Sequence, residues 1–150
     1  MDNYIINEET MAIIPYGKKK SIVYERSRFF IIKKAPNFII KKSCLANGFS
    51  LEARHELTFE LTGYKYKAPI IVNESLCLIF FPTCSPRLKQ VEWVSLNHIK
   101  KFYDNRIKNS TYIMFNNEKI IEFDESINIM KNQILRATHL EAIYMKNKKK

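Results

Sequence analysis

Four cationic side chains lie between residues 81 and 102, a segment that also holds two prolines, Pro82 and Pro86, and the only tryptophan of the chain, Trp93. Because each proline fixes one backbone torsion, the segment loses little conformational entropy when it binds a ligand. A stiff loop with several positive charges suits a ligand that carries negative charge, such as a phosphate. The alternative is a solvated loop without a ligand. The cations are Arg87, Lys89, Lys100 and Lys101.

A second pair of cations, Lys65 and Lys67, alternates with Tyr64 and Tyr66. If this stretch forms a strand, cations and aromatic ring edges line it together, as they do in surfaces that bind nucleic acid. Tyrosines that are half-buried in the fold explain the same pattern equally well. We keep both lysines as candidate contacts for a polyanion.

Two other residues of the 81–102 segment are expected to serve the fold. Trp93 is flanked by the apolar Val91 and Val94, which predicts a buried anchor. The alternative, a ring that stacks on a base, requires single-stranded nucleic acid. His98 is expected to form a hydrogen bond within the protein.

The sequence contains no pattern that predicts an enzyme. His55, His98 and His139 are scattered, and no glycine-rich phosphate loop or nucleophile motif is present. Cys84 and His98 would form a nucleophile pair only if folding brought them together. The same two residues would need two further ligands to hold zinc. We therefore predict no catalytic residues, no metal site and no cofactor, and the three cysteines are expected to be buried or neutral thiols.

The charge of the chain favours a polyanionic partner. It carries 25 Lys and Arg against 15 Asp and Glu, a formal net charge of +10. Four of these cations are lysines in residues 146–150, which we assign to a basic tail. The remaining excess is partly explained by a composition rich in Ile, Lys and Asn, as AT-rich genomes tend to produce.

Bulk properties predict one cytoplasmic domain over residues 1–145. A hydrophobic content of 46% with 13% aromatics is typical of a packed core. The longest apolar run, Leu76 to Phe81, is far shorter than the roughly 20 residues that cross a membrane. The N-terminus shows no secretory signal, so no membrane partner is expected.

The elements that position the cations are expected to be mostly antiparallel strands. Apolar and β-branched stretches separated by turn residues indicate them. The turn between the third and fourth strands is expected at 35–37. Residues 43–62 fit a short helix or a strand, and we leave them open. The expected strands are 11–14, 21–24, 28–33, 38–42, 69–72 and 76–81, most of 92–103, then 111–115 and 118–123.

The last part of the chain predicts a hairpin followed by a helix. Asn116 and Asn117 tolerate positive φ, which favours a tight two-residue turn. Asp124 or Ser126 then caps a helix that runs to about Tyr144. The face expected to dock on the sheet holds Ile127, Met130, Ile134, Ala137 and Tyr144. A second apolar pair, Ile129 and Ile143, lies among polar residues on the other face and indicates another contact, such as a second subunit. The fold class is thus α+β.

The pattern of the 81–102 segment resembles the ComK family of competence transcription factors. The motif residues are Phe81-Pro82-Thr83, Ser85-Pro86, Trp93-Val94-Ser95, His98-Ile99 and Phe102. Similar segments precede and follow it in the family order, from YIINEETMAIIP near the N-terminus to TYIMFNNEKIIEFDESINIMKNQILRATHL. The resemblance covers roughly residues 4 to 145.

This resemblance implies a sequence-specific activator of competence genes that binds AT-rich double-stranded DNA through the minor groove as an oligomer. Arg54, in LEARHE, matches a basic position of the family and is the next candidate DNA contact. Further partners that the resemblance implies are RNA polymerase and a proteolysis adaptor. Longer family members carry an extension beyond the last helix, whereas this chain ends at KNKKK. The alternative is therefore a regulatory protein-interaction module of the same fold without DNA binding of its own.

Overall fold

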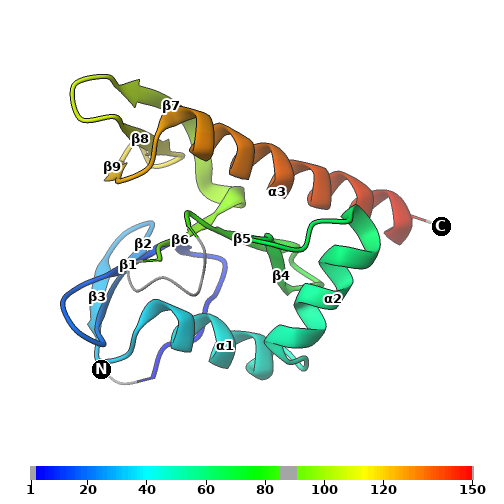
Figure 1. Cartoon of the computed structure of the whole chain (residues 1–150). Helices are drawn as coiled ribbons and strands as arrows, with labels where there is room; N and C mark the ends of the chain where they lie inside the picture. The colour runs from blue at the N-terminus through cyan, green and yellow to red at the C-terminus, as the bar shows by residue number, and fades with distance from the viewer. Residues whose placement is uncertain (1–2, 85–90, 150) are drawn as a thin grey trace.

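A six-stranded antiparallel sheet is the centre of the computed structural model, which describes residues 3–84 and 91–149. Its strand order is β3-β2-β1-β6-β5-β4, so β6 lies between the three strands β1–β3 and the hairpin of β4 and β5 (Figure 1). The strands are β1 (Thr10–Pro15), β2 (Ser21–Glu25), β3 (Phe29–Ile32), β4 (Ile70–Asn73), β5 (Leu78–Pro82) and β6 (Trp93–Ser95). Five predicted strands are thereby confirmed, and β6 is the first part of the extended segment predicted for most of 92–103.

A second, smaller sheet follows a short 3-10 turn, η1 (Leu96–His98). It has the order β7-β8-β9, and all of its pairs are antiparallel. Its strands are β7 (Ile99–Asn105), β8 (Ser110–Phe115) and β9 (Ile120–Phe123). With the three helices of the described residues, the two sheets confirm the predicted α+β class.

The predicted hairpin after Phe115 is confirmed, but its loop has three residues and not two. The amide of Glu118 donates to the carbonyl of Phe115 at 2.8 Å, and the amide of Phe115 donates to the carbonyl of Lys119 at 2.9 Å. The residue with positive φ is Glu118, at 72°. A three-residue loop that ends in a left-handed residue is a common hairpin geometry, and here Asn116 and Asn117 occupy its other two positions.

The predicted strand at 38–42 is wrong, because this stretch belongs to the helix α1 (Pro36–Ala46). Pro36, which we assigned to a turn, occupies the first helical position, where its fixed φ and missing N–H are tolerated. Ile39, Ile40 and Cys44 are all buried. Their spacing places them on one helical face, and the stretch between Phe38 and Lys42 is too short to separate this pattern from a buried strand.

The open stretch at 43–62 contains the helix α2 (Leu51–Thr62). Ser50 caps it, with its hydroxyl accepting from the Ala53 amide at 3.0 Å. Gly63 ends it in the left-handed region at φ 82°. Residues 64–67, which we considered as a strand, contain no strand.

The last helix, α3 (Ile127–Lys148), continues beyond the predicted end at Tyr144. Ser126 is its cap: the hydroxyl accepts from the amide of Ile129 at 3.3 Å. The docking face includes Met130 and Ala137 as predicted, and also Leu140 and the polar Gln133. Gln133 is satisfied because its amide nitrogen donates to the backbone carbonyls of Lys67 and Pro82.

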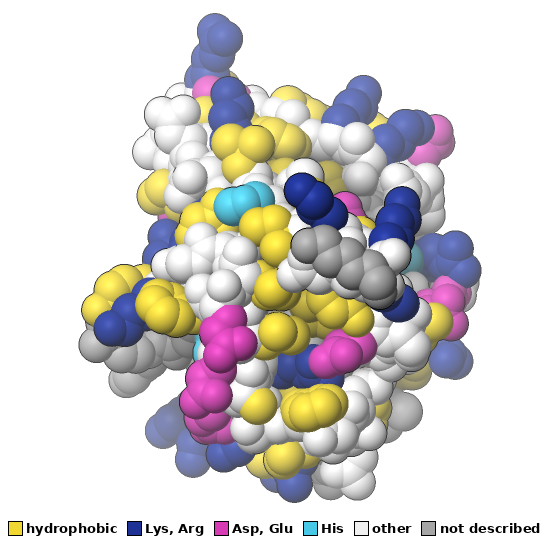
Figure 2. Space-filling view, turned by 90° about the vertical axis from the view of Figure 1, so that its right-hand side faces the viewer, with side chains coloured by type: hydrophobic (Ala, Val, Ile, Leu, Met, Phe, Trp, Pro, Cys, Tyr) yellow, Lys and Arg dark blue, Asp and Glu magenta, His cyan; other side chains and the backbone are white. Residues whose placement is uncertain are grey.

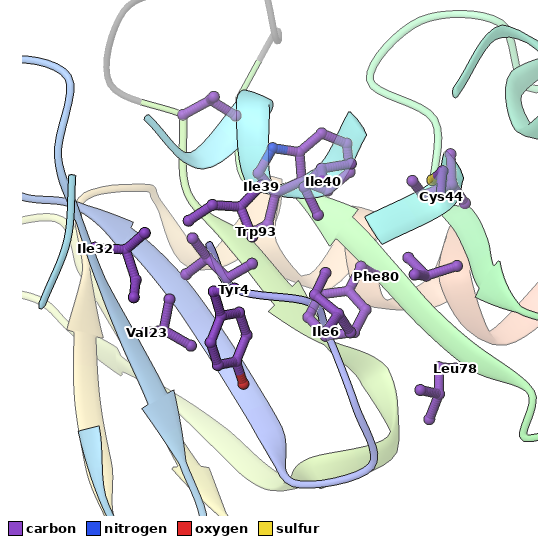
Figure 3. Close-up of a cluster of buried hydrophobic side chains, with 14 residues drawn as sticks. Tyr4, Ile6, Val23, Ile32, Ile39, Ile40, Cys44, Leu78, Phe80 and Trp93 are labelled. Carbon is purple, nitrogen blue, oxygen red and sulfur yellow. The ribbon is translucent and has the colours of Figure 1, made fainter. Parts of the chain in front are cut away.

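Two apolar clusters hold the fold together, one on each face of the large sheet. The α1 cluster joins Ile39, Ile40 and Cys44 to sheet residues such as Phe80 and Trp93 (Figure 3). The α3 cluster joins Met130, Ala137 and Leu140 to the small sheet and to the other face of the large one. Successive side chains on β5 alternate between the two clusters, because neighbouring residues of a strand point to opposite faces.

Candidate nucleic-acid interface

Trp93 is a buried anchor, as predicted. It is 1% exposed within the α1 cluster, and its indole Nε1–H donates to Oδ1 of Asn37 at 2.9 Å. His98 is also used internally, since its Nε2 lies 2.6 Å from the backbone carbonyl oxygen of Glu8. Burial lowers the pKa of the His98 imidazole. These two residues of the motif therefore belong to the fold and not to a ligand site.

Arg87 and Lys89, the first candidates for phosphate contact, lie outside the described residues. On either side of this gap, Thr83 and Glu92 are joined. The Thr83 amide donates to the carbonyl of Glu92 at 2.9 Å, and its hydroxyl donates to the Glu92 carboxylate at 3.1 Å. Burial raises the pKa of Glu92 to about 7. The hydrogen bond from Thr83 lowers this pKa in part, whereas the negative charges of Glu125 and Asp124 raise it further.

Lys100 and Lys101 are exposed residues of β7 on the small sheet. The Lys100 ammonium lies 3.6 Å from the carboxylate of Glu118, in the hairpin loop between β8 and β9. Both partners are well exposed, so this ion pair contributes little stability and leaves Lys100 accessible to a ligand. Lys101 is paired in register with Met114 of β8.

Arg54 is 2% exposed, although the resemblance implied a DNA contact. Its Nη1 donates to the Glu74 carboxylate at 2.5 Å, and its guanidinium carbon lies 4.4 Å from the centre of the Phe49 ring. A buried guanidinium costs free energy unless it is paired, and Glu74 supplies the partner. The structure therefore places Arg54 within the fold and not on the accessible surface.

Lys65 and Lys67 lie in the irregular connection between α2 and β4. The Lys65 ammonium is 5.7 Å from the centre of the Tyr66 ring, which is 70% exposed. Lys65 also lines a shallow hollow of about 320 Å³ together with two carboxylates, Glu56 and Glu60. Lys67 has a positive φ of 52°, and its carbonyl accepts from Gln133 and Arg136 of α3.

The right-hand face of the molecule, formed by α2 and the end of α3, carries mixed charge. Figure 2 shows acidic side chains among the cations and apolar side chains there. Tyr64, expected on a strand with Lys65, instead places its hydroxyl 2.7 Å from Nδ1 of His139 and its ring beneath Arg136. The cations on this face therefore do not form one continuous positive surface (Figure 2).

A larger set of cations was absent from the predicted sites. We call it the lysine end of the sheet. A signal for it was present in the sequence, because residues 10–24 and 27–51 contain no Asp or Glu. Only the fold brings these stretches together. The lysine end consists of Lys18, Lys19, Lys20, Lys33, Lys34, Lys41 and Lys42.

The described residues offer little for metal or nucleophile chemistry. No three of their His, Cys, Asp or Glu side chains come together in a way that could hold a metal ion. Cys44 is fully buried, which raises the pKa of its thiol to about 11. Burial also raises the thiol pKa of Cys77 and of Cys84. Among the described helices, none is both long enough and apolar enough to span a membrane.

Comparisons with known proteins point to one family. A family model described as "ComK protein" matches residues 1–149. A curated relative, the "Competence transcription factor" of Bacillus subtilis (strain 168), is 32% identical over 143 residues. The match covers 93% of this chain and 74% of that protein. No solved structure matches the chain at a significant level.

Proposed function

Since the chain belongs to the ComK family, we propose that it is a DNA-binding transcription regulator of competence, the uptake of DNA by bacteria. The observation that carries this proposal is the family match over nearly the whole chain, together with a relative whose name states that function. The protein acts as an activator in the cytoplasm and is not an enzyme. It binds AT-rich promoter sites as an oligomer.

Physical properties of the chain support a DNA partner. The net charge of +10 attracts a polyanion and steers its approach. A·T tracts have a narrow minor groove with a strongly negative potential, which attracts Lys and Arg. Within the described residues, Lys100, Lys101 and Lys65 are exposed and can approach such a groove.

The proposed contacts follow from the sequence and, for Arg54, from its burial. We retain the Arg87 and Lys89 loop, whose two flanks are joined by Thr83 and Glu92. Arg54 is left to the fold because its guanidinium is buried against Glu74. The retained contacts are Arg87, Lys89, Lys100, Lys101, Lys65 and Lys67.

Binding to two matched duplexes tests the proposal directly. Fluorescence anisotropy would compare one AT-rich and one GC-rich duplex of equal length over a series of salt concentrations. We expect tighter binding to the AT-rich duplex. A plot of log K against the logarithm of the salt concentration should have a slope of about −0.9 for each phosphate contact. Binding without AT preference, or no binding at moderate salt, would contradict the proposal that the protein is an activator that binds AT-rich DNA.

The alternative, an interaction module without DNA binding, is favoured by the outer face of α3. Leu135 is 60% exposed there, and Ile129 is 39% exposed. The same experiment separates the two candidates, because an interaction module shows no duplex binding at any salt concentration tested. Sedimentation at several protein concentrations reports whether a second copy covers this face.

A further inference from the structure

The turn between β1 and β2 lies at the same end of the large sheet as the connection between β3 and α1. Pro15 pairs with Ser21, and Ser21 pairs with Ile32, so the chain leaves the sheet at one place before Lys18 and after Ile32. The Ser21 hydroxyl donates to the carbonyl of Lys34 at 2.6 Å, which fixes the connection against β2. The two segments that carry these lysines are therefore neighbours, at the lower left of Figure 1.

Helix α1 continues this surface through Phe38, Lys41 and Lys42. The ammonium of Lys34 lies 4.8 Å from the centre of the Phe38 ring, and that of Lys42 lies 5.7 Å from it. Phe38 is 38% exposed, so the ring holds two cations at the surface and does not bury them. The start of α1 is tied to the core by the hydrogen bond between Trp93 and Asn37. These lysines thus project from a fixed frame.

The charge of the lysine end is not balanced by acids. None of the ion pairs within the described residues includes any of its seven lysines. Several other cations do have carboxylate partners, as Arg26 has Glu9 and Arg54 has Glu74. Six of the seven lysines are exposed, and Lys34 is half-buried. The first turn of α1 also has no acidic side chain, so the positive end of its dipole adds to the potential.

We propose that the lysine end binds the phosphate backbone of double-stranded DNA and is the main electrostatic contact of this protein. This inference rests on the proposed function as a DNA-binding regulator, and it names a surface that lies apart from Lys100, Lys101 and Lys65. Ammonium groups bind phosphates as point charges and do not read base edges. The lysine end therefore sets affinity and orientation, and the preference for A·T pairs arises elsewhere on the protein.

The test compares two triple variants of the full chain that remove equal charge. The first is Lys33→Gln/Lys41→Gln/Lys42→Gln at the lysine end. The matched control is Lys108→Gln/Lys131→Gln/Lys146→Gln, at exposed positions on other elements. Both lower the net charge by three, so a general effect of charge is the same in the two proteins.

We expect the lysine-end variant to lose affinity on the order of tenfold at about 0.1 M salt, equally for AT-rich and GC-rich duplexes. Its salt slope falls by about 0.9 for each contact removed, or up to about 2.7 for all three. The control keeps its slope within about one contact. A second variant, Lys18→Gln/Lys20→Gln, shows the same pattern and leaves Lys19 unchanged, because Lys19 has a positive φ of 58°.

Each other outcome has one meaning. If the unmodified protein binds DNA and the lysine-end variants match the control in affinity and slope, this inference is wrong and the proposed function stands. If the unmodified protein binds neither duplex, the proposed function fails and this inference with it. A selective loss on the AT-rich duplex would place the lysines on base edges and would also overturn the inference. Circular dichroism and Trp93 fluorescence confirm that each variant is folded.

Discussion

The side chains of Trp93 and Asn37, 56 residues apart in sequence, are joined by a hydrogen bond of 2.9 Å from the indole Nε1–H to Oδ1. This bond connects the central strand of the large sheet to the second residue of α1. It satisfies the single polar group of a ring that is otherwise surrounded by apolar side chains (Figure 3). The start of α1, and the lysines around it, are thereby positioned by the core.

Asn37→Ala is expected to lower the free energy of unfolding by about 1–3 kcal/mol, because the buried indole N–H loses its acceptor. Urea denaturation followed by circular dichroism measures the change. The control is Asn132→Ala on the exposed side of α3, which should change stability by no more than about 0.5 kcal/mol. Equal stability of the two variants would show that the bond is not required by the fold.

Arg54→Gln is expected to destabilise the protein by about 2–4 kcal/mol without weakening DNA binding by the folded fraction. The reason is that the guanidinium is buried between Glu74 and Phe49. Arg106→Gln removes the same charge at a residue that is 92% exposed, and should be nearly neutral for stability. A variant at Arg54 with normal stability but reduced DNA affinity would contradict this assignment.

The contribution of Glu92 to the stability of the protein is expected to become more unfavourable as pH rises from about 4.5 to about 7. Burial raises the pKa of this carboxyl to about 7, so the folded state retains a proton that the unfolded state has released. Above pH 7 the buried carboxylate is ionised in the folded state, which lowers the free energy of unfolding by at most about 3 kcal/mol. The loss is smaller where solvent reaches the carboxylate.

Glu92→Gln removes this dependence, because the amide fills the same volume without a charge. Its free energy of unfolding, relative to the unmodified protein, should therefore increase between pH 5 and pH 8. Glu60→Gln on the exposed surface of α2 controls for the change in net charge. A parallel pH profile for Glu92→Gln and the unmodified protein would mean that Glu92 is not the group responsible.

Glu118→Gly is expected to be more stable than Glu118→Ala by about 1 kcal/mol. Residue 118 has φ 72°, where a side chain costs energy and glycine does not. Both variants lose the exposed ion pair with Lys100. The difference between their stabilities therefore reports the cost of placing a side chain at this positive φ. Thermal denaturation of the two proteins measures it, and identical midpoints would show that the loop relaxes at no cost.

The strands were predictable where apolar runs are bounded by turn residues, as at β1, β2, β5, β8 and β9. The failure at 38–42 has a physical cause: a run such as Phe38-Ile39-Ile40 is apolar in either conformation, and Pro36 is acceptable both in a turn and at a helix start. Only the packing of α1 against the sheet decides between them. The role of Trp93 in the fold was predictable because Val91 and Val94 near it are apolar.

The candidate site was less accessible to prediction. A charge count treats Arg54 and Lys41 alike, yet the first is buried against Glu74 and the second is exposed. Whether a cation is paired depends on which acids the fold brings near it. The lysine end shows the same limit, since two of its segments are neighbours only through the pairing of Ser21 with Pro15 and Ile32, and the third is placed by α1. Affinity for a polyanion depends on that convergence.

The strand order of the large sheet places β6 between its two halves, so β6 connects them. Strands β1, β2 and β3 lie on one side of β6, and β4 and β5 lie on the other. The two groups are joined within the sheet through three residues, Trp93 to Ser95. On the β1 side the register consists of two pairs, Ala12 with Val94 and Ile13 with Trp93. Within the sheet, the hydrogen bonds of the tryptophan segment therefore connect the two halves, and α1 packs across both from one face. Residues of the motif that resembles the family thus connect the two halves of the sheet, so a substitution that weakens their pairing would loosen one half from the other.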